Sequence, residues 1–327
     1  MDLTPVSVLI PCLNEEAFIV NCIESILSGS YELDKLEILV IDGGSADNTI
    51  NLVKELQEKH PQIRIINNPK TSVPAALNIG RRESTHEHLI WLGAHAIYDK
   101  HYISNSIRTL LSNKVASVGG VITPVGRSYL GRAIAIATQA MFGIGNAKYR
   151  YATTPQHVDT VFGGCWTKTT LSKIGGFNEC WKRNQDYELN TRLRKQIGPI
   201  LLNPEIKCEY FCRDRLPCLA HQYFEYGYWR FRTLIKHPST LNIRVLAPPI
   251  FVIGSAASII SMPFFGPLTA MPLIVYLSIS FLISIYLSIK HKQYSTLLFL
   301  PLIFLCIHLS WGLGFITSIT NHLMNRK

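Results

Sequence analysis

Residues 38–49, ILVIDGGSADNT, join a short apolar run to an aspartate, two glycines and a polar turn. This pattern predicts a buried strand that carries Asp42 at its carboxyl end and turns at once into a helix. A second apolar run, residues 6–13, ends in a similar way in PCLNEE. Open α/β sheets bind ligands at the carboxyl ends of their strands. The two strand ends therefore predict a nucleotide pocket.

Apolar strands and amphipathic helices alternate along the first 125 residues. Such alternation is typical of an α/β fold with a mostly parallel sheet and helices on both faces. We expect Ser45 to be the N-cap of the second helix. The strands are predicted at residues 6–13, 36–42, 63–67, 88–92 and 116–125, and the helices at 15–27, 46–59, 74–82 and 100–111.

The pattern weakens between residues 128 and 156, where glycine and other small residues are common. We expect a helix there, followed by a mobile loop over the pocket. Regular patterns return with predicted strands at 161–167 and 200–202 and predicted helices at 186–196 and 216–237. The last helix interleaves aromatic side chains with arginine and lysine, which is typical of a helix that lies in a membrane interface.

Hydrophobic residues make up 47% of the chain, and many of them lie in uncharged stretches at residues 245–265, 267–289 and 295–320. Each stretch is long enough to cross a bilayer, which takes about 20 residues. Lys290, Lys292 and the basic run before residue 245 predict that those turns are cytoplasmic. The chain is therefore expected to be a multi-pass protein of the cell inner membrane or plasma membrane, with its α/β part in the cytoplasm. Three spans would leave Arg326 and Lys327 outside, against the positive-inside rule.

The formal net charge of the chain is +10, and no acidic residue follows Glu225. Eight lysines and arginines come after that position, close to the apolar stretches. Positive charge beside apolar spans indicates contact with anionic lipid headgroups rather than with nucleic acid. We therefore expect membrane lipids, and no nucleic acid, among the partners.

The first loop offers Pro11, Asn14 and Glu15 as candidate ligand-binding residues. Asparagine and glutamate also favour helix starts, so a turn and cap, taken alone, explain them better. Asp42 has no such structural explanation, and Gly43 and Gly44 beside it let the backbone approach a ligand closely. A carboxylate here can accept a hydrogen bond from a uracil or guanine ring or from a ribose hydroxyl.

The ordered series PCLNEE, IDGGSADNT and GGCWTKTTLSKIGGFNECWKRNQDYELNTRLRKQIG resembles glycosyltransferase family 2, whose members share the GT-A fold. Within the family, the segment QYFEYGYWRFRTLIKHP and the apolar tail are most similar to the succinoglycan-biosynthesis type. The resemblance implies a Rossmann-like mixed sheet for nucleotide sugars. It also implies a catalytic domain over residues 1–215, an acceptor helix region over 216–244 and a membrane region over 245–327.

Several site residues follow from the resemblance. Asp42 matches the aspartate that reads the nucleoside base, and Asp186 matches the catalytic base of a Glu-Asp pair whose first acid is replaced by Gln185. The donor loops would contribute Pro11, Asn14, Glu15 and Gly44, and the acceptor motif would contribute Gln222, Tyr226, Trp229 and Arg230.

The segment WLGAHAIYD departs from the family pattern at its metal site. Gly93 stands where the first carboxylate belongs, and His95 occupies the metal-side position. Imidazole binds Mn²⁺ acceptably and Mg²⁺ poorly, because Mg²⁺ prefers oxygen ligands. The resemblance still implies a divalent metal, Mn²⁺ or Mg²⁺, held by His95 and the donor diphosphate.

The resemblance implies an inverting enzyme that uses a nucleoside diphosphate sugar, expected to be a UDP-sugar. Its acceptor would be a membrane-associated glycan on a polyprenyl diphosphate, in exopolysaccharide or cell-surface glycan synthesis. The replacements at Gly93 and Gln185 leave an alternative open, a catalytically degenerate GT-A scaffold of a polysaccharide assembly complex.

Overall fold

The computed structural model describes residues 4–324, so Arg326 and Lys327 lie outside the described residues. The chain forms two compact units. The first unit comprises the residues up to Thr123 together with Ala147–Tyr210, and the second comprises Pro124–Asn146 and the residues from Phe211 onward. The catalytic, acceptor and membrane regions, expected to meet at residues 215 and 244, are a division by function and stay a prediction.

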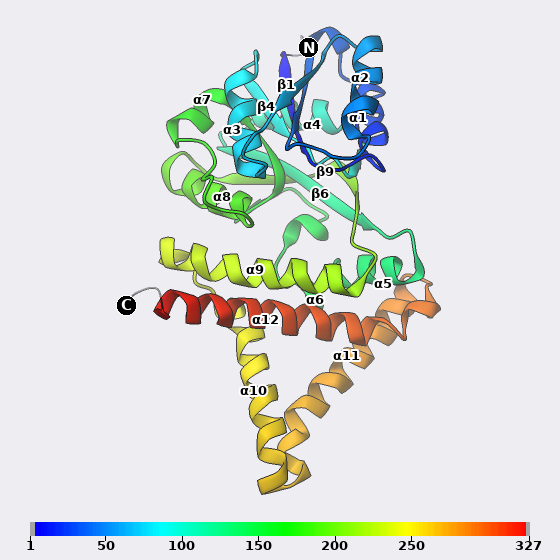
Figure 1. The fold of residues 1–327 in the computed structure, drawn as a ribbon, viewed down its shortest axis with the longest axis vertical. Helices are drawn as coiled ribbons and strands as arrows, with labels where there is room; N and C mark the ends of the chain where they lie inside the picture. Colours follow the sequence, from blue (N-terminus) through cyan, green and yellow to red (C-terminus); the bar gives the residue numbers. More distant parts are fainter. Residues whose placement is uncertain (1–3, 325–327) are drawn as a thin grey trace. The chain divides into compact units, whose positions relative to one another are not determined.

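A nine-stranded sheet forms the centre of the first unit, in the order β3-β2-β1-β4-β8-β6-β9-β5, with β7 beside β9 (Figure 1). The strands are β1 Val6–Cys12, β2 Leu36–Asp42, β3 Ile63–Asn67, β4 His88–Trp91, β5 Ala96–Tyr98, β6 Ser117–Val125, β7 Gln156–Val158, β8 Phe162–Thr167 and β9 Ile200–Phe211.

Two hydrophobic clusters hold helices against opposite faces of this sheet, and the strands β1 and β2 between them are buried on both sides. One cluster joins the sheet to α1, α2 and α4, and the other joins it to α3, α7 and α8. The bounds are α1 Ile19–Leu27, α2 Thr49–Lys59, α3 Val73–Glu83, α4 Tyr102–Ser112, α7 Lys168–Lys173 and α8 Gln185–Gln196.

The sheet is mixed, as the family resemblance implies. The alternation of strands and helices alone predicted a mostly parallel sheet, and that prediction was wrong. β1, β2, β3 and β4 pair in parallel, whereas the β4–β8, β6–β8, β5–β9 and β7–β9 pairs are antiparallel. The predicted strand at 200–202 continues to Phe211. The second half of β9 alternates buried Ile206 and Cys208 with exposed polar residues. The strands β5 and β7 have three residues each, which is too short for a recognisable strand pattern in the sequence.

The second unit is helical. Its helices are α5 Tyr129–Ala137, α6 Met141–Ile144, α9 Leu216–Lys236, α10 Ile243–Phe265, α11 Met271–Lys290 and α12 Leu300–Met324. Helix α5 corresponds to the helix expected after residue 128, while the mobility expected of the following loop stays a prediction. Three segments are long and apolar enough to cross a membrane, at Ile243–Phe265, Pro267–Lys290 and Leu300–Met324.

Glycines let α9 and α12 approach until their backbones touch. A Cβ atom on Gly227 of α9 would lie 1.9 Å from the carbonyl oxygen of Trp311 in α12. A Cβ atom on Gly314 of α12 would lie 2.0 Å from the carbonyl oxygen of Phe224 in α9. Small residues at such a contact are the usual means of close helix packing in membrane proteins.

We expect Gly314→Val to destabilise the protein by about 2–4 kcal/mol, because the new side chain meets backbone that cannot move aside. The measurement is the melting temperature of the protein in detergent. Gly254→Val on α10 is the matched control, since a Cβ atom there meets nothing within 4 Å. Equal melting temperatures for the two variants would show that the α9–α12 contact is not close-packed.

Candidate active site

The predicted donor-side residues lie where two neighbouring parallel strands end. Cys12 of β1 pairs with Asp42 of β2, so the loops after these strands leave the sheet at the same edge. Pro11 lies inside β1, half-buried, opposite Ile41. This edge is where open α/β sheets bind their ligands.

Hydrogen bonds between backbone and side chains fasten the two loops together. The Asn14 amide donates to Ser45 Oγ at 2.9 Å, and Asn14 Oδ1 accepts from the Ala46 amide at 2.8 Å. The Glu15 amide donates to Thr49 Oγ1 at 2.8 Å. Asn14 adopts a left-handed conformation with φ of 55°, which asparagine tolerates better than most residues. The loops therefore form one connected rim rather than two separate turns.

The Asp42 carboxylate organises its own loop. It is 8% exposed and accepts from the Gly44 amide at 3.0 Å, the Ser45 amide at 3.1 Å and Ser45 Oγ at 2.6 Å. Gly44 has φ of 89°, so a glycine suits this turn. Ser45 is not the helix N-cap that we expected, because its hydroxyl is bound to Asp42 and α2 begins at Thr49. Base reading by Asp42 stays a prediction.

His95 follows β4 and is paired with Glu15 from the first loop. Its Nδ1 lies 2.9 Å from Glu15 Oε1, and the side chains are 27% and 18% exposed. Because a carboxylate accepts, the imidazole donates from Nδ1, which in the neutral ring leaves the lone pair on Nε2. Metal-binding histidines are commonly oriented by a carboxylate in this way. The sequence gives no sign of this pairing, since the two residues are 80 positions apart.

Gly93 lies in the loop after β4, and the Tyr98 hydroxyl is hydrogen-bonded to its backbone. The Gly93 amide donates to the Tyr98 hydroxyl at 2.7 Å, and that hydroxyl donates to the Gly93 carbonyl at 3.0 Å. Across residues 4–324, the side chains of His, Cys, Asp and Glu form no group of three or more that could hold a metal ion. A metal-binding role for His95 therefore stays a prediction.

Three residues that the sequence analysis missed extend this region. The Tyr210 ring, near the end of β9, lies 5.0 Å from the His95 ring. The Arg150 guanidinium lies 5.6 Å from the Tyr210 ring and 5.7 Å from the Tyr149 ring, within the range of a cation–π interaction. They were missed because residues 128–156 show no periodicity and β9 is longer than predicted.

Asp186 lies in the first turn of α8, after Asn184, which has φ of 56°. Its Oδ1 accepts from the Tyr187 amide at 2.8 Å. Burial raises the pKa of Asp186 to about 6, against the lowering effect of backbone hydrogen bonds. Burial also raises the pKa of Tyr149, the Arg150 guanidinium lowers it, and the Asp186 charge raises it further. Asp186 thus lies within electrostatic range of Tyr149.

Contacts join five of these residues, from Glu15 to Tyr149, and Asp186 is added to them for its electrostatic effect on Tyr149. We call the six residues the Glu15–Asp186 series. Its members are Glu15, His95, Tyr210, Arg150, Tyr149 and Asp186. The series joins the strand-end loops to the start of α8. It therefore links a group that can bind a metal, a fixed positive charge and a carboxylate whose pKa suits proton transfer near neutral pH.

Residues 7–170, half of the chain, match the sequence profile described as Glycosyl transferase family 2. The chain belongs to glycosyltransferase family 2. Relatives with established names support this membership. The succinoglycan biosynthesis protein ExoA of Rhizobium meliloti (strain 1021) is 28% identical over 243 residues, which are 74% of this chain and 73% of that protein.

A second relative covers almost the whole chain. It is the dolichyl N-acetyl-alpha-D-glucosaminyl phosphate 3-beta-D-2,3-diacetamido-2,3-dideoxy-beta-D-glucuronosyltransferase of Methanococcus voltae, 29% identical over 317 residues. The match spans 94% of this chain and 95% of that enzyme. This family 2 glycosyltransferase therefore has homologues in polysaccharide and glycan synthesis.

Among solved structures, the mannosyltransferase PcManGT from Pyrobaculum calidifontis, in complex with GDP-Man and Mn²⁺, has a TM-score of 0.68. The alignment covers 98% of this chain and 88% of that one at 16% sequence identity. This likeness confirms the GT-A fold. Gln185 is buried, and the replacement of family acids by Gln185 and Gly93 stays a prediction.

A buried ion pair holds the segment before α8 in this glycosyltransferase. Glu188, which is fully buried, binds Arg192 with both carboxylate oxygens, at 2.8–3.0 Å. Arg192 also donates to the carbonyl oxygens of Ile174 and Gly176, at 2.6 and 2.8 Å. The pair thereby ties α8 to the glycine turn that precedes it and helps to position Asp186.

The predicted acceptor-side residues all lie on α9, in the second unit. Gln222 Nε2 donates to the Tyr226 hydroxyl at 2.8 Å, one turn along the helix. Trp229 is half-buried and lies 5.7 Å from the Arg232 guanidinium. Arg230 donates to the Thr240 carbonyl at 2.7 Å. A role in acceptor binding stays a prediction for these four residues.

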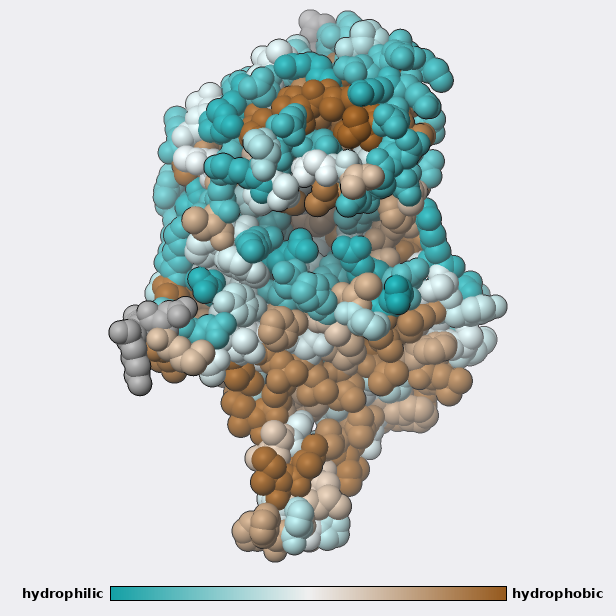
Figure 2. Space-filling view, viewed as in Figure 1, coloured by the Kyte–Doolittle hydropathy of each residue, from teal (hydrophilic) through white to brown (hydrophobic). Residues whose placement is uncertain are grey.

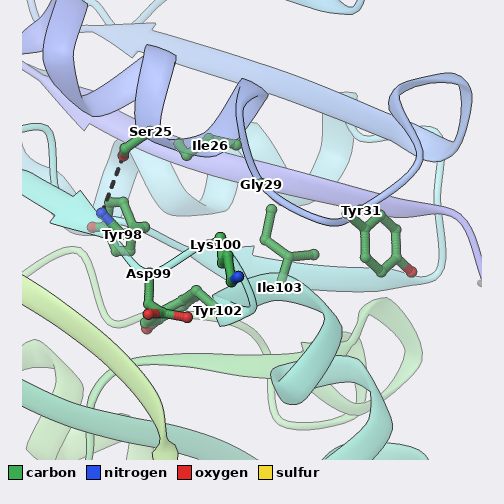
Figure 3. Close-up of a pocket in the computed structure, with 9 residues that line it drawn as sticks. All are labelled: Ser25, Ile26, Gly29, Tyr31, Tyr98, Asp99, Lys100, Tyr102 and Ile103. Carbon is green, nitrogen blue, oxygen red and sulfur yellow. Dashed lines mark hydrogen bonds between the residues drawn. The ribbon is translucent and has the colours of Figure 1, made fainter.

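A small pocket elsewhere in the first unit is lined by residues of α1, the segment 98–100 and α4 (Figure 3). Tyr98 is one of the lining residues, and its amide donates to Ser25 Oγ at 3.1 Å. The lining residues include none of the predicted site residues, and most of them are apolar or aromatic. We therefore do not assign this pocket to the glycosyl transfer reaction.

Arg192→Met should destabilise the protein by about 3–5 kcal/mol, because it leaves the buried Glu188 without its ionic partner. Thermal unfolding monitored by intrinsic fluorescence would measure the effect. Arg108→Met is the matched control, since Arg108 and Glu205 form an exposed pair, 58% and 65% accessible, worth at most about 1 kcal/mol. The assignment fails if the two variants unfold at the same temperature.

Proposed function

We propose that this glycosyltransferase moves a sugar from a nucleoside diphosphate sugar, with UDP as the expected nucleotide, to a lipid-linked saccharide at the cytoplasmic face of a membrane. The observation that carries the proposal is the Glu15–Asp186 series. It supports a single site with a donor side at the strand-end loops and a proton-accepting group at α8. The fastened rim formed by Asn14, Glu15 and the Asp42 loop would receive the nucleoside.

The residues present fit a divalent ion that is held mainly by the substrate. We assign His95 Nε2 as the protein ligand, because Glu15 accepts from Nδ1. Diphosphate oxygens would supply further ligands, and the imidazole favours Mn²⁺ over Mg²⁺. When bound, such an ion neutralises charge on the departing diphosphate.

Arg150 is assigned to the diphosphate as a second positive charge. Its guanidinium lies against Tyr149 and Tyr210, and the Tyr210 ring also contacts His95. Arginine stays charged at every physiological pH and can bind phosphate oxygens in pairs. A fixed cation of this kind stabilises the leaving group even where the metal is weakly held. Arg150 therefore offsets part of the loss caused by glycine at position 93.

Asp186 is assigned as the general base. The acceptor hydroxyl attacks the anomeric carbon, the bond from that carbon to the diphosphate breaks, and the hydroxyl proton passes to the Asp186 carboxylate. One displacement assisted by one base inverts the anomeric configuration. The first turn of α8 and the pKa of about 6 suit this role, because the carboxylate is mostly ionised at neutral pH yet basic enough to accept a proton.

The acceptor is proposed to be carried on a polyprenyl phosphate or diphosphate. Arg232 and Lys236 are exposed on α9, close in sequence to the membrane-capable segments, and guanidinium groups bind phosphate oxygens well. The name of the Methanococcus voltae relative describes an acceptor on dolichyl phosphate. Simple anchoring to lipid headgroups would use the same charges.

Asp186→Asn should lower kcat by about 10²–10⁴-fold, since an amide cannot accept the proton. In the wild type, the rate should fall about tenfold per pH unit once the pH drops below about 6, because protonation removes the base. Turnover of UDP- and GDP-sugars by membranes containing the protein, with Mn²⁺, gives both results. The exposed Asp34→Asn variant is the control and should keep full activity.

Near-normal turnover by Asp186→Asn would remove the base assignment. If the wild-type protein turned over no sugar nucleotide at all, the replacements at Gly93 and Gln185 would favour the degenerate scaffold instead.

Gly93→Asp should tighten Mn²⁺ binding in the presence of UDP by about tenfold or more, because it adds a carboxylate ligand. The position accepts a side chain, since a Cβ atom would lie 3.8 Å from Phe162 Cζ and 3.9 Å from the Tyr98 hydroxyl. Calorimetric titration measures the affinity. Gly93→Asn is the neutral control of equal size, and equal affinities for the two variants would argue against a metal beside position 93.

A further inference from the structure

Helices α9 and α12 lie side by side along their lengths and run in the same direction (Figure 1). Near their starts, Cys306 Sγ of α12 lies 4.0 Å from the Leu216 carbonyl oxygen of α9. The glycine contacts described above join their middles. Near their ends, the His322 ring lies 5.9 Å from the Phe231 ring. Two parallel helices in contact over this length must share the same depth and tilt in a membrane.

Helix α9 cannot cross a bilayer. It carries charged side chains along its second half, and it is not among the segments apolar enough to span. Charged side chains in the hydrocarbon core are costly unless they pair there or line a water-filled cavity. These residues are Glu225, Arg230, Arg232 and Lys236. Because α12 runs beside α9, it cannot cross either.

The apolar side chains of α12 have another explanation, because many of them are buried against other helices of the protein. In its most apolar window 39% of the residues are buried, against 11% in α10 and in α11. His308, in the first half of α12, is hydrogen-bonded at both ring nitrogens. Its Nε2 donates to the Phe142 carbonyl of α6 at 2.8 Å, so Nδ1 of the neutral ring accepts from the Tyr276 hydroxyl of α11 at 2.7 Å. The helix is thus enclosed by α6, α9 and α11.

We propose that α12 lies in the plane of the membrane surface beside α9, and that the α10–α11 hairpin is the membrane-crossing element of the described chain. The inference rests on the membrane location in the proposed function and replaces the three spans expected from the sequence. Figure 2 shows hydrophobic side chains over α10, α11 and α12. The occupant of this surface is the bilayer, because both helices are long and apolar enough to cross one and expose large apolar side chains such as Ile253, Phe264 and Leu282.

Charge supports the hairpin topology. With two crossings, the cationic residues that flank α10 and α11 in the sequence lie on one side of the membrane, as the positive-inside rule requires. Arg326 and Lys327, which follow α12 in the sequence, would join them. These flanking residues are Arg230, Arg232, Lys236, Arg244, Lys290 and Lys292. The conflict created by three spans therefore disappears.

Epitope tags test the topology in sealed vesicles that contain the full-length protein. We expect tags at the two chain ends to be digested by protease from the same side, and a tag inserted after Gly266 to be digested from the opposite side. End tags on opposite sides would overturn the proposal, as would a Gly266 tag on the same side as the end tags. The readout does not depend on sugar transfer, so an inactive enzyme would leave it intact.

Depth measurement distinguishes a surface helix from a spanning one directly. Leu302 and Leu313 on α12 are 51% and 48% exposed and stand 11 residues apart, about 16 Å along a helix and on nearly the same face. Val275 and Tyr286 on α11, 48% and 61% exposed, form a matched pair with the same spacing. A spin label attached to a genetically encoded ketone amino acid leaves the eight native cysteines in place.

In lipid nanodiscs, we expect the two α12 labels to report the same depth and the two α11 labels to differ by most of that axial distance. A depth difference for the α12 pair as large as that for the α11 pair would overturn the proposal. Unchanged melting temperatures of the labelled proteins would show that all four positions tolerate the label.

Discussion

The candidate active site depends on the parallel pairing of β1 with β2. The register that sets Cys12 opposite Asp42 makes both strands end at one edge, so the loops that follow can bond to each other. Asn14 and Glu15 then find partners in Ser45, Ala46 and Thr49. A one-residue change of register would turn every side chain of a strand to the opposite face and separate these partners.

The joined loops after β1 and β2 also orient the functional groups near the end of β4. Because the Glu15 amide is fixed by Thr49, its carboxylate is held beside His95 and orients the imidazole. The family resemblance implies acids at positions 93 and 185, where this chain has glycine and glutamine. The site retains a histidine oriented by a carboxylate and, through Tyr210, gains a nearby guanidinium from Arg150. Positive charge at the diphosphate can thus come from the protein as well as from a metal.

The second unit follows a different physical constraint, close backbone contact at glycines. Gly227 and Gly314 bring α9 and α12 together so tightly that one helix cannot take a depth of its own in the membrane. Hydropathy treats each helix separately and therefore classes α12 with α10 and α11. The contact with a charged neighbour separates α12 from the other two. The proposed surface helices would also lie at the headgroup level, where the phosphate of a lipid-linked acceptor is found.

By itself, the sequence determined the α/β class, the strands that end in Asp42 and PCLNEE, the family and the apolar helices, because these depend on local periodicity and on short motifs. Tertiary structure decided the mixed half of the sheet, the Glu15–His95 pair, the Glu15–Asp186 series and the partnership of α9 with α12. These features depend on residues far apart in the sequence, such as the 80 positions between Glu15 and His95 and the 90 between Leu216 and Cys306, and no local pattern records such a contact. The length of β9 was underestimated for the same reason, since its polar second half pairs with β5, a strand more than 100 positions earlier in the sequence.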